Sequence, residues 1–190
     1  MIHSDSQNTG CQNMSEKELC EYLQPKLENH FKVWPEVYVK DIITGKRGRL
    51  DFLCVPLFET VRKLIGIEVK TAEALIKPNE ALRQCMDYRR AVLESKKCSE
   101  FNGMALCQVH LVTPQFFGYR NITSTQFAIC EKPHFLYPLQ LAQKYHVGIL
   151  AILSTGDIVL TQGKETWWTS RQGVRSDDDI WHSREKFGSL

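Results

Sequence analysis

Several features that define other classes of protein are missing from this sequence. No apolar run approaches the ~18 residues that a membrane-spanning helix needs, and the opening segment MIHSDSQNTG lacks the charged-then-apolar layout of a signal peptide. The seven cysteines are scattered, odd in number and without a CxxC pair, which argues against a disulfide framework and against a zinc site. We therefore expect reduced thiols in a cytoplasmic protein that does not enter membranes.

Excess charge of either sign is also missing. The formal net charge of +2 is too small to demonstrate nucleic-acid binding. Basic residues are instead grouped locally, in the segment TGKRGR (44–49) and between positions 83 and 97. Such groups suit phosphate contacts, but each is explained equally well as a solvated loop or helix face. The candidates for nucleic-acid binding are Lys46, Arg47, Arg49 and Arg83.

The chain has enough apolar residues to build a core. Its 190 residues, 43% of them hydrophobic, suit one domain of ordinary size. We expect a disordered lead-in over 1–14, a domain over 15–162 and a tail over 163–190 that holds three of the four tryptophans. The tail is expected to pack on the domain or to contact substrate, since exposed tryptophans would form an unusual apolar patch.

Hydrophobic periodicity predicts alternating helices and strands. Leu19, Leu23, Leu27 and Phe31 are four residues apart, which indicates a helix over 15–31, and Ser15 with Glu18 predicts a capping box at its start. Residues 113–137 show no clear period. The order α-β-β-β-α-β-α-β-β predicts an α/β fold with a mixed sheet flanked by helices. The remaining predicted elements are strands at 36–43, 50–55, 64–70 and 104–112, helices at 79–94 and 139–146, and a hairpin of strands 147–153 and 157–162.

One apolar strand carries two charged residues. In LIGIEVK, Glu68 and Lys70 point to one face with Cα atoms ~7 Å apart, and Asp51 on the preceding strand can lie beside Glu68 if the two strands form a hairpin. Two facing carboxylates repel each other unless a proton or cation lies between them, and oxygen ligands suit Mg²⁺ or Mn²⁺. An E-x-K triplet also occurs by chance on exposed strand faces. The apolar flanks, Asp51 and the helix that follows favour a site.

At these residues the chain resembles the PD-(D/E)XK nuclease superfamily. Asp51 matches the first acid of its pattern, and Glu68-Val69-Lys70 matches the (D/E)-x-K triplet. Gln84 and Tyr88 in RQCMDYRR match the Q-x-x-x-Y signature of one large branch. The resemblance covers roughly residues 15–112, and Leu50 stands where the motif name has proline. It implies a restriction-endonuclease-like fold with a C-terminal helix-hairpin extension.

The resemblance also implies roles for the matched residues. The metal would be held by Asp51, Glu68 and the backbone carbonyl of Val69, with Lys70 orienting a water. A first-helix acid often joins such sites; Glu16 is the candidate, although Glu18, Glu21 and Glu28 compete with it, and an acid at a helix N-terminus is also stabilising by itself. The implied catalytic residues are Asp51, Glu68, Lys70, Gln84 and Tyr88.

The function implied is a Mg²⁺- or Mn²⁺-dependent nuclease that hydrolyses DNA phosphodiester bonds in repair, recombination, mobile-element biology or defence. Duplex or branched DNA is the expected partner, and a homodimer or a complex with other proteins is compatible with the sequence. The alternative is a non-catalytic nucleic-acid-binding or regulatory module on the same fold. An RNA-processing or tRNA-splicing-type enzyme is less favoured, because the scattered histidines assemble into no His/Tyr/Lys arrangement.

Overall fold

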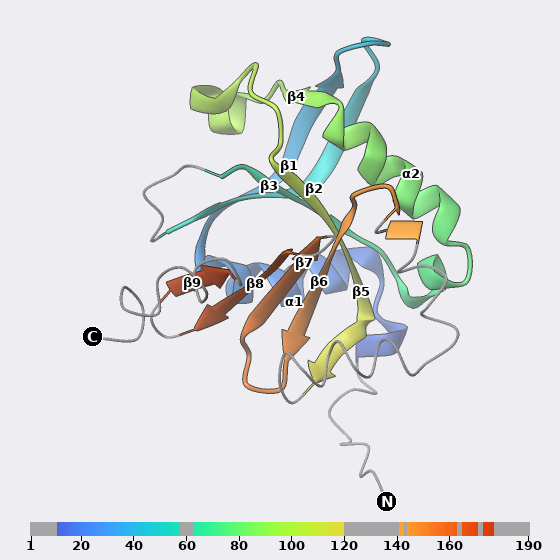
Figure 1. The fold of residues 1–190 in the computed structure, drawn as a ribbon, viewed down its shortest axis with the longest axis vertical. Helices are drawn as coiled ribbons and strands as arrows, with labels where there is room; N and C mark the ends of the chain where they lie inside the picture. Colours follow the sequence, from blue (N-terminus) through green and yellow to red (C-terminus); the bar gives the residue numbers. More distant parts are fainter. Residues whose placement is uncertain are drawn as a thin grey trace, which may run out of the picture.

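The fold is a single mixed β-sheet with a helix on each face (Figure 1). The computed structural model describes residues 11–57, 63–119, 141–142, 144–162, 165–170 and 173–176. In these residues the strands follow the order β4-β1-β2-β3-β5-β6-β7-β8-β9. β3 pairs with β5 and β5 with β6 in parallel, and the other neighbours are antiparallel. The predicted α/β class is confirmed.

The first half of the chain builds the part of the sheet that carries the predicted site. Helix α1 comes first, followed by the antiparallel strands β1, β2 and β3 and then by helix α2. The bounds are η1 (Cys11–Asn13), α1 (Glu16–Glu28), β1 (Phe31–Asp41), β2 (Arg47–Pro56), β3 (Ile65–Val69), η2 (Ala72–Leu75) and α2 (Pro78–Arg89).

The second half extends the sheet on both sides. A short strand, β4, adds to the free edge of β1, while the later strands continue from β3. The bounds are β4 (Ala91–Leu93), η3 (Lys96–Phe101), β5 (Gln108–Tyr119), β6 (Gly148–Leu153), β7 (Ile158–Gln162), β8 (Glu165–Ser170) and β9 (Gly173–Ser176).

Helix α1 covers one face of the sheet through the predicted leucine stripe. Leu19, Leu23 and Leu27 are all buried, and they pack with a cluster that includes Ile67 and Val69 of β3. The predicted capping box is confirmed: the Ser15 backbone N–H donates to Glu18 Oε2 at 2.8 Å, and the Glu18 backbone N–H donates to the Ser15 hydroxyl. The stripe and the cap together fix where α1 begins and which side it buries.

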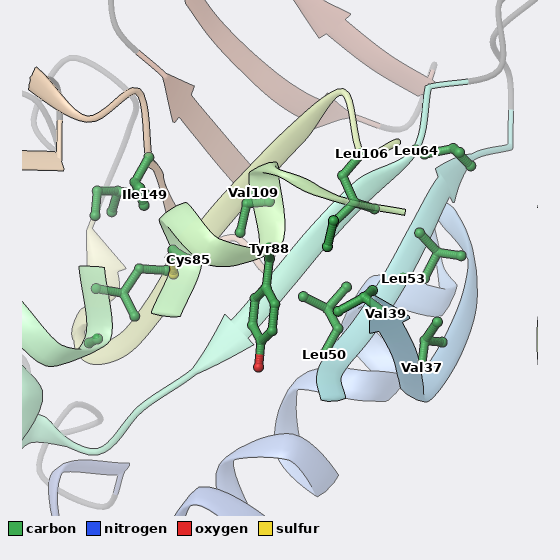
Figure 2. Close-up of a cluster of buried hydrophobic side chains, with 14 of the residues drawn as sticks. Val37, Val39, Leu50, Leu53, Leu64, Cys85, Tyr88, Leu106, Val109 and Ile149 are labelled. Atoms are coloured by element: carbon green, nitrogen blue, oxygen red, sulfur yellow. The ribbon is translucent and has the colours of Figure 1, made fainter. Parts of the chain in front are cut away.

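Helix α2 covers the other face. Its buried residues, which include Leu82, Cys85 and Tyr88, pack against Leu50 and Val39 of the β1–β2 hairpin. Figure 2 shows the Tyr88 ring beside these two aliphatic side chains. The alternation along β3 therefore sends Ile67 and Val69 toward α1 and leaves Glu68 on the α2 side of the sheet.

Several predicted boundaries are wrong. The predicted helix over 79–94 ends at Arg89, because Ala91, Val92 and Leu93 pair with the edge of β1 as strand β4. Phe31 opens β1 instead of closing the first helix, so the strand predicted over 36–43 occupies Phe31–Asp41. The strand predicted over 104–112 runs from Gln108 to Tyr119, into the stretch without a clear period.

Segments on both sides of the expected domain pack with it, which for the tail is one of the two expected alternatives. Within the predicted lead-in over 1–14, Cys11 is buried and Met14 packs against the α1-side cluster; residues 1–10 lie outside the described residues. Within the predicted tail, β8 pairs with β7 and β9 pairs with β8, so these segments continue the sheet. An edge strand such as β7 offers unpaired backbone groups that a following segment can bond.

The expectation of free thiols is confirmed within the described part of the chain. Every cysteine in the described ranges is free, and Cys130 lies outside them. Residues 141, 142 and 144 of the helix predicted over 139–146 are helical. No helix within the described ranges is both long and apolar enough to cross a membrane. The free cysteines are Cys11, Cys20, Cys54, Cys85, Cys98 and Cys107.

Candidate active site

The site is built where β2 and β3 stop pairing. Their ladder includes Leu53–Gly66 and Phe52–Ile67, and one further step places Asp51 opposite Glu68. At this level the backbone N–H of Val69 donates to Asp51 Oδ2 at 2.7 Å. The carboxylate of Asp51 is thus fixed to the backbone of β3 beside Glu68, as the sequence predicts.

Lys70 joins Glu68 to the first helix. Its backbone N–H donates to the carbonyl of Val112 at 2.9 Å, which ties it to β5. Its Nζ lies 2.6 Å from Glu68 Oε1 and 3.4 Å from Glu16 Oε1. One ammonium therefore contacts acids from β3 and from the start of α1.

The structure selects one acid among the four on the first helix. Glu18 is engaged in the capping box, Glu21 lies 3.9 Å from Lys17, and Glu28 accepts a hydrogen bond from Gln24. Only Glu16, of these four, forms an ion pair with Lys70. The arrangement brings Glu16 to the cluster and keeps its competitors in local contacts.

Burial raises the pKa values of both Glu68 and Asp51. Glu68 is 1% exposed, and burial, together with the charge of Asp51, raises its pKa to about 7. Burial also raises the pKa of Asp51, although the Val69 N–H and the Lys70 charge oppose this. For Lys70, burial alone lowers the pKa, but the carboxylates of Glu68, Glu16 and Asp51 outweigh it and raise the pKa. The cluster therefore favours bound positive charge.

The donor set fits a hard divalent cation only in part. Within the described ranges, no three His, Cys, Asp or Glu side chains are placed to hold a metal by themselves. Glu68 Oε2, however, is buried and without a hydrogen-bond partner, which leaves one carboxylate oxygen available to a ligand. Mg²⁺ binds through one or two carboxylates and completes its shell with water and phosphate oxygens. Asp51 and Glu68 meet that requirement, and the role assigned to the Val69 carbonyl remains a prediction.

Gln84 and Tyr88 form a polar chain that ends on β2. Gln84 Nε2 donates to the Tyr88 hydroxyl at 2.7 Å, and this hydroxyl donates to the backbone carbonyl of Arg49 at 2.6 Å. Gly48 makes room for the ring, because a Cβ there would lie 2.8 Å from Tyr88 Cε1. The chain supports the β2 backbone two residues before Asp51, and any direct contact with metal or phosphate remains a prediction.

This support can be tested with Tyr88→Phe. The variant keeps the ring but leaves the Arg49 carbonyl and the Gln84 amide without their partner, so we expect about 1–2 kcal/mol lower unfolding free energy. Because β2 positions Asp51, we also expect the cleavage that the resemblance implies to slow by roughly tenfold, or about 1.4 kcal/mol. Urea unfolding and initial rates give the two values. Gln84→Ala removes only the outer bond and should cost less in both; an equal loss would mean that Gln84 acts on substrate directly.

Two features of the site are not visible in the sequence patterns used above. Glu36 adopts a positive φ of 52°. Its neighbours Pro35 and Val37 pair with Phe52 and Leu50 of β2, but Glu36 itself does not pair with Asp51. Phe31 packs toward α1 and Val37 toward α2, so the alternation of β1 is interrupted at this point. Cys20 lies four residues after Glu16, and burial, followed by the charge of Asp51, raises the pKa of its thiol to about 12. Helical spacing from Glu16 could have indicated Cys20.

The basic candidates remain on the surface. Arg47 Nε lies 2.8 Å from Glu94 Oε2, and Arg49 Nη1 lies 3.2 Å from Glu36 Oε1. Lys46 is exposed beside Arg47, and Arg83 is exposed on α2. Arg49 and Arg47 precede Asp51 by two and four residues on the same strand, whereas Arg83 belongs to a separate element.

Comparisons with protein-family models, with curated proteins and with solved structures gave no match.

Proposed function

We propose that this protein is a Mg²⁺- or Mn²⁺-dependent nuclease that hydrolyses phosphodiester bonds in DNA. The observation that carries the proposal is the half-buried Asp51 beside the buried Glu68, with Glu68 Oε2 unpartnered among the described residues and Lys70 Nζ 2.6 Å from Oε1. A purely structural ion pair needs one acid for one base. Here Lys70 contacts two acids, Glu68 and Glu16, and the charge of a third, Asp51, also acts on it; this excess of negative charge at a strand end is costly for a fold without a further cation.

The restriction-endonuclease-like fold is part of the same proposal. Its supports are the order of α1, β1, β2, β3, α2 and β5 and the placement of the acid and the triplet on neighbouring strands. The resemblance to the PD-(D/E)XK superfamily supplies the same assignment from sequence. Repair, recombination, mobile-element biology and defence are the contexts in which such an activity operates.

The residues of the site divide the chemistry among them. Asp51 and Glu68 would hold the cation, with Glu16 at its outer side. When bound, the cation polarises the phosphodiester and lowers the pKa of a water. Lys70 would position a water for attack on phosphorus. The bond from phosphorus to the leaving oxygen breaks as the new bond forms, the attacking water loses its proton to solvent, and the leaving oxygen takes a proton from solvent. Tyr88 maintains the backbone of β2 from which Asp51 projects.

The proposal is tested with a panel of labelled linear, circular, branched and single-stranded DNAs. We expect cleavage with Mg²⁺ or Mn²⁺, and binding without cleavage with Ca²⁺, whose looser coordination positions water poorly. EDTA should abolish product. The nuclease proposal is wrong if no DNA of the panel is cleaved and no Mg²⁺ or Mn²⁺ binds at millimolar concentration. The non-catalytic binding module would then be the remaining function.

A further inference from the structure

The β1–β2 hairpin carries two large apolar side chains into solvent at its tip. Ile42 and Ile43 are 66% and 75% exposed. The hairpin extends beyond the rest of the sheet, at the top of Figure 1. Isolated exposed isoleucines are common, but two adjacent ones at the end of a projecting hairpin form a small exposed apolar patch that does not pack against the core.

The turn that presents these residues is fixed by hydrogen bonds. Asp41 Oδ1 accepts from the backbone N–H groups of Ile43 and Thr44, each at 2.8 Å. The Gly45 N–H donates to the Asp41 carbonyl at 2.9 Å, with Gly45 at a φ of 69° that favours glycine. Arg90 Nη2 lies 3.5 Å from Asp41 Oδ2 and anchors the turn to α2. The isoleucines are thus held outward by a preorganised backbone.

One face of the hairpin between the tip and the site is basic. Val37 and Val39 are buried toward α2, so the residues that alternate with them face the other way. Across the ladder, Tyr38 is opposite Arg49 and Lys40 is opposite Arg47. This face, called the basic face below, consists of the basic residues Lys40, Arg47 and Arg49 together with Tyr38.

The acids near this face compete weakly for the arginines. The Arg47–Glu94 and Arg49–Glu36 pairs are all between exposed side chains, and such pairs contribute little to stability. Phosphate oxygens can therefore replace them at small cost. This face fits a polyanion, because the planar guanidinium groups of Arg47 and Arg49 can bind phosphate in a bidentate manner.

The dimensions of the hairpin match a DNA duplex that starts at the site. Lys46 lies five residues before Asp51, so the tip is about 17–20 Å away at ~3.4 Å per strand residue. At ~3.4 Å per base step this distance is about five to six base pairs. Arg49 and Arg47 are two residues apart, or ~7 Å, which spans about two base steps.

Resting on the proposed nuclease function, we propose that the β1–β2 hairpin is a duplex-binding arm. The basic face follows the phosphates of one strand away from the site. Ile42 and Ile43 enter the minor groove about five to six base pairs from the scissile phosphate and wedge a base step apart. Apolar wedges flanked by basic residues recognise duplexes in this way, and they gain contact area by bending the DNA.

The test compares two exposed isoleucines in the full-length protein. Binding to a short duplex is measured in EDTA, where no cleavage interferes, with 2-aminopurine placed at successive steps. Ile43→Ser should weaken binding about five- to tenfold, the scale for one apolar side chain leaving a contact, and should remove a fluorescence rise seen with the wild type. Ile76→Ser is the matched control, because Ile76 is 78% exposed outside the hairpin; it should change neither value.

A second variant tests the basic face. Arg47→Ala should weaken duplex binding and reduce the slope of log affinity against log salt by about one, as expected for one lost phosphate contact. Lys144→Ala, which removes an exposed charge outside the hairpin, should leave the slope unchanged. Equal slopes for the two variants would overturn the assignment of this face.

The outcomes separate the arm from the nuclease. Equal binding by the Ile43 and Ile76 variants, or no fluorescence change at any step, overturns the arm while cleavage by the wild type still stands. Duplex binding with the expected variant effects but no cleavage overturns the nuclease alone. Two other results would also overturn the proposal. If Ile43→Ser abolished binding to anionic vesicles instead of duplex binding, the tip would be assigned to a membrane. If it abolished self-association, measured by sedimentation, the tip would be assigned to a second copy of the chain.

Discussion

Asp51→Asn is expected to abolish metal-dependent cleavage while leaving the fold intact. The asparagine oxygen can still accept the Val69 N–H that Asp51 Oδ2 accepts at 2.7 Å, so the local shape is kept. The negative charge is lost, however, and Asp51 is one of the two carboxylates proposed to hold the cation. We expect cleavage to fall at least ~10³-fold, about 4 kcal/mol of transition-state stabilisation.

Binding gives the complementary readout for this variant. Because repulsion between the site and the phosphates decreases, duplex affinity in EDTA should be equal to or higher than that of the wild type. Mn²⁺ affinity, measured by calorimetry, should decrease. An Asp51→Asn protein that cleaves at the wild-type rate would remove Asp51 from the site.

Lys70→Ala separates metal binding from chemistry. The ammonium now neutralises Glu68 and Glu16 at 2.6 and 3.4 Å. Its removal leaves the carboxylates without a counter-charge, so a cation should bind as tightly as before or more tightly. Cleavage should nevertheless be lost, because no group positions the water. Lys17→Ala is the matched control: Lys17 pairs with Glu21 on the surface of α1 and should not affect the rate. Full activity of Lys70→Ala would contradict the role.

The core of the site could be predicted because it depends on strand periodicity. Because side chains alternate along a strand, Glu68 points to the face opposite that of Ile67 and Val69. Antiparallel pairing of β2 with β3 then brings Asp51 opposite Glu68. Helical spacing likewise predicts the leucine stripe of α1, and its capping box fixes Glu16 in the first turn. Each of these features is local in sequence or requires only one pairing between neighbouring strands.

Features that depend on distant contacts could not be predicted. The segment Ala91–Leu93 continues an apolar helical pattern, and only the free edge of β1 makes it a strand. The bond from Tyr88 to the Arg49 carbonyl joins residues 39 positions apart. The positive φ of Glu36 gives no sequence signal, because glycine is the residue that normally marks such a conformation. Tertiary context decides all three.

Glu68→Gln is expected to stabilise the metal-free protein and to remove its response to metal. Burial and the charge of Asp51 raise the pKa of Glu68 from an ordinary 4.5 to about 7. The folded state therefore holds this proton more tightly than the unfolded chain. As pH rises from about 4.5 to about 7, the unfolded chain ionises first, and stability falls by roughly 3 kcal/mol, at ~1.4 kcal/mol per pKa unit. Above pH 7 the loss is complete.

Glutamine keeps the shape of the protonated acid and cannot ionise, so it should avoid this loss. In EDTA at pH 8, Glu68→Gln should melt several degrees above the wild type, whereas near pH 4.5 the two should coincide. Millimolar Mg²⁺ should raise the melting temperature of the wild type alone, since a ligand that binds only the folded state stabilises it. Glu80→Gln, an exposed substitution on α2, should follow the wild type throughout. A Glu68→Gln protein less stable than the wild type at pH 8 would show that the Glu68–Lys70 pair stabilises the fold by itself, and the electrostatic case for a cation at this site would be lost.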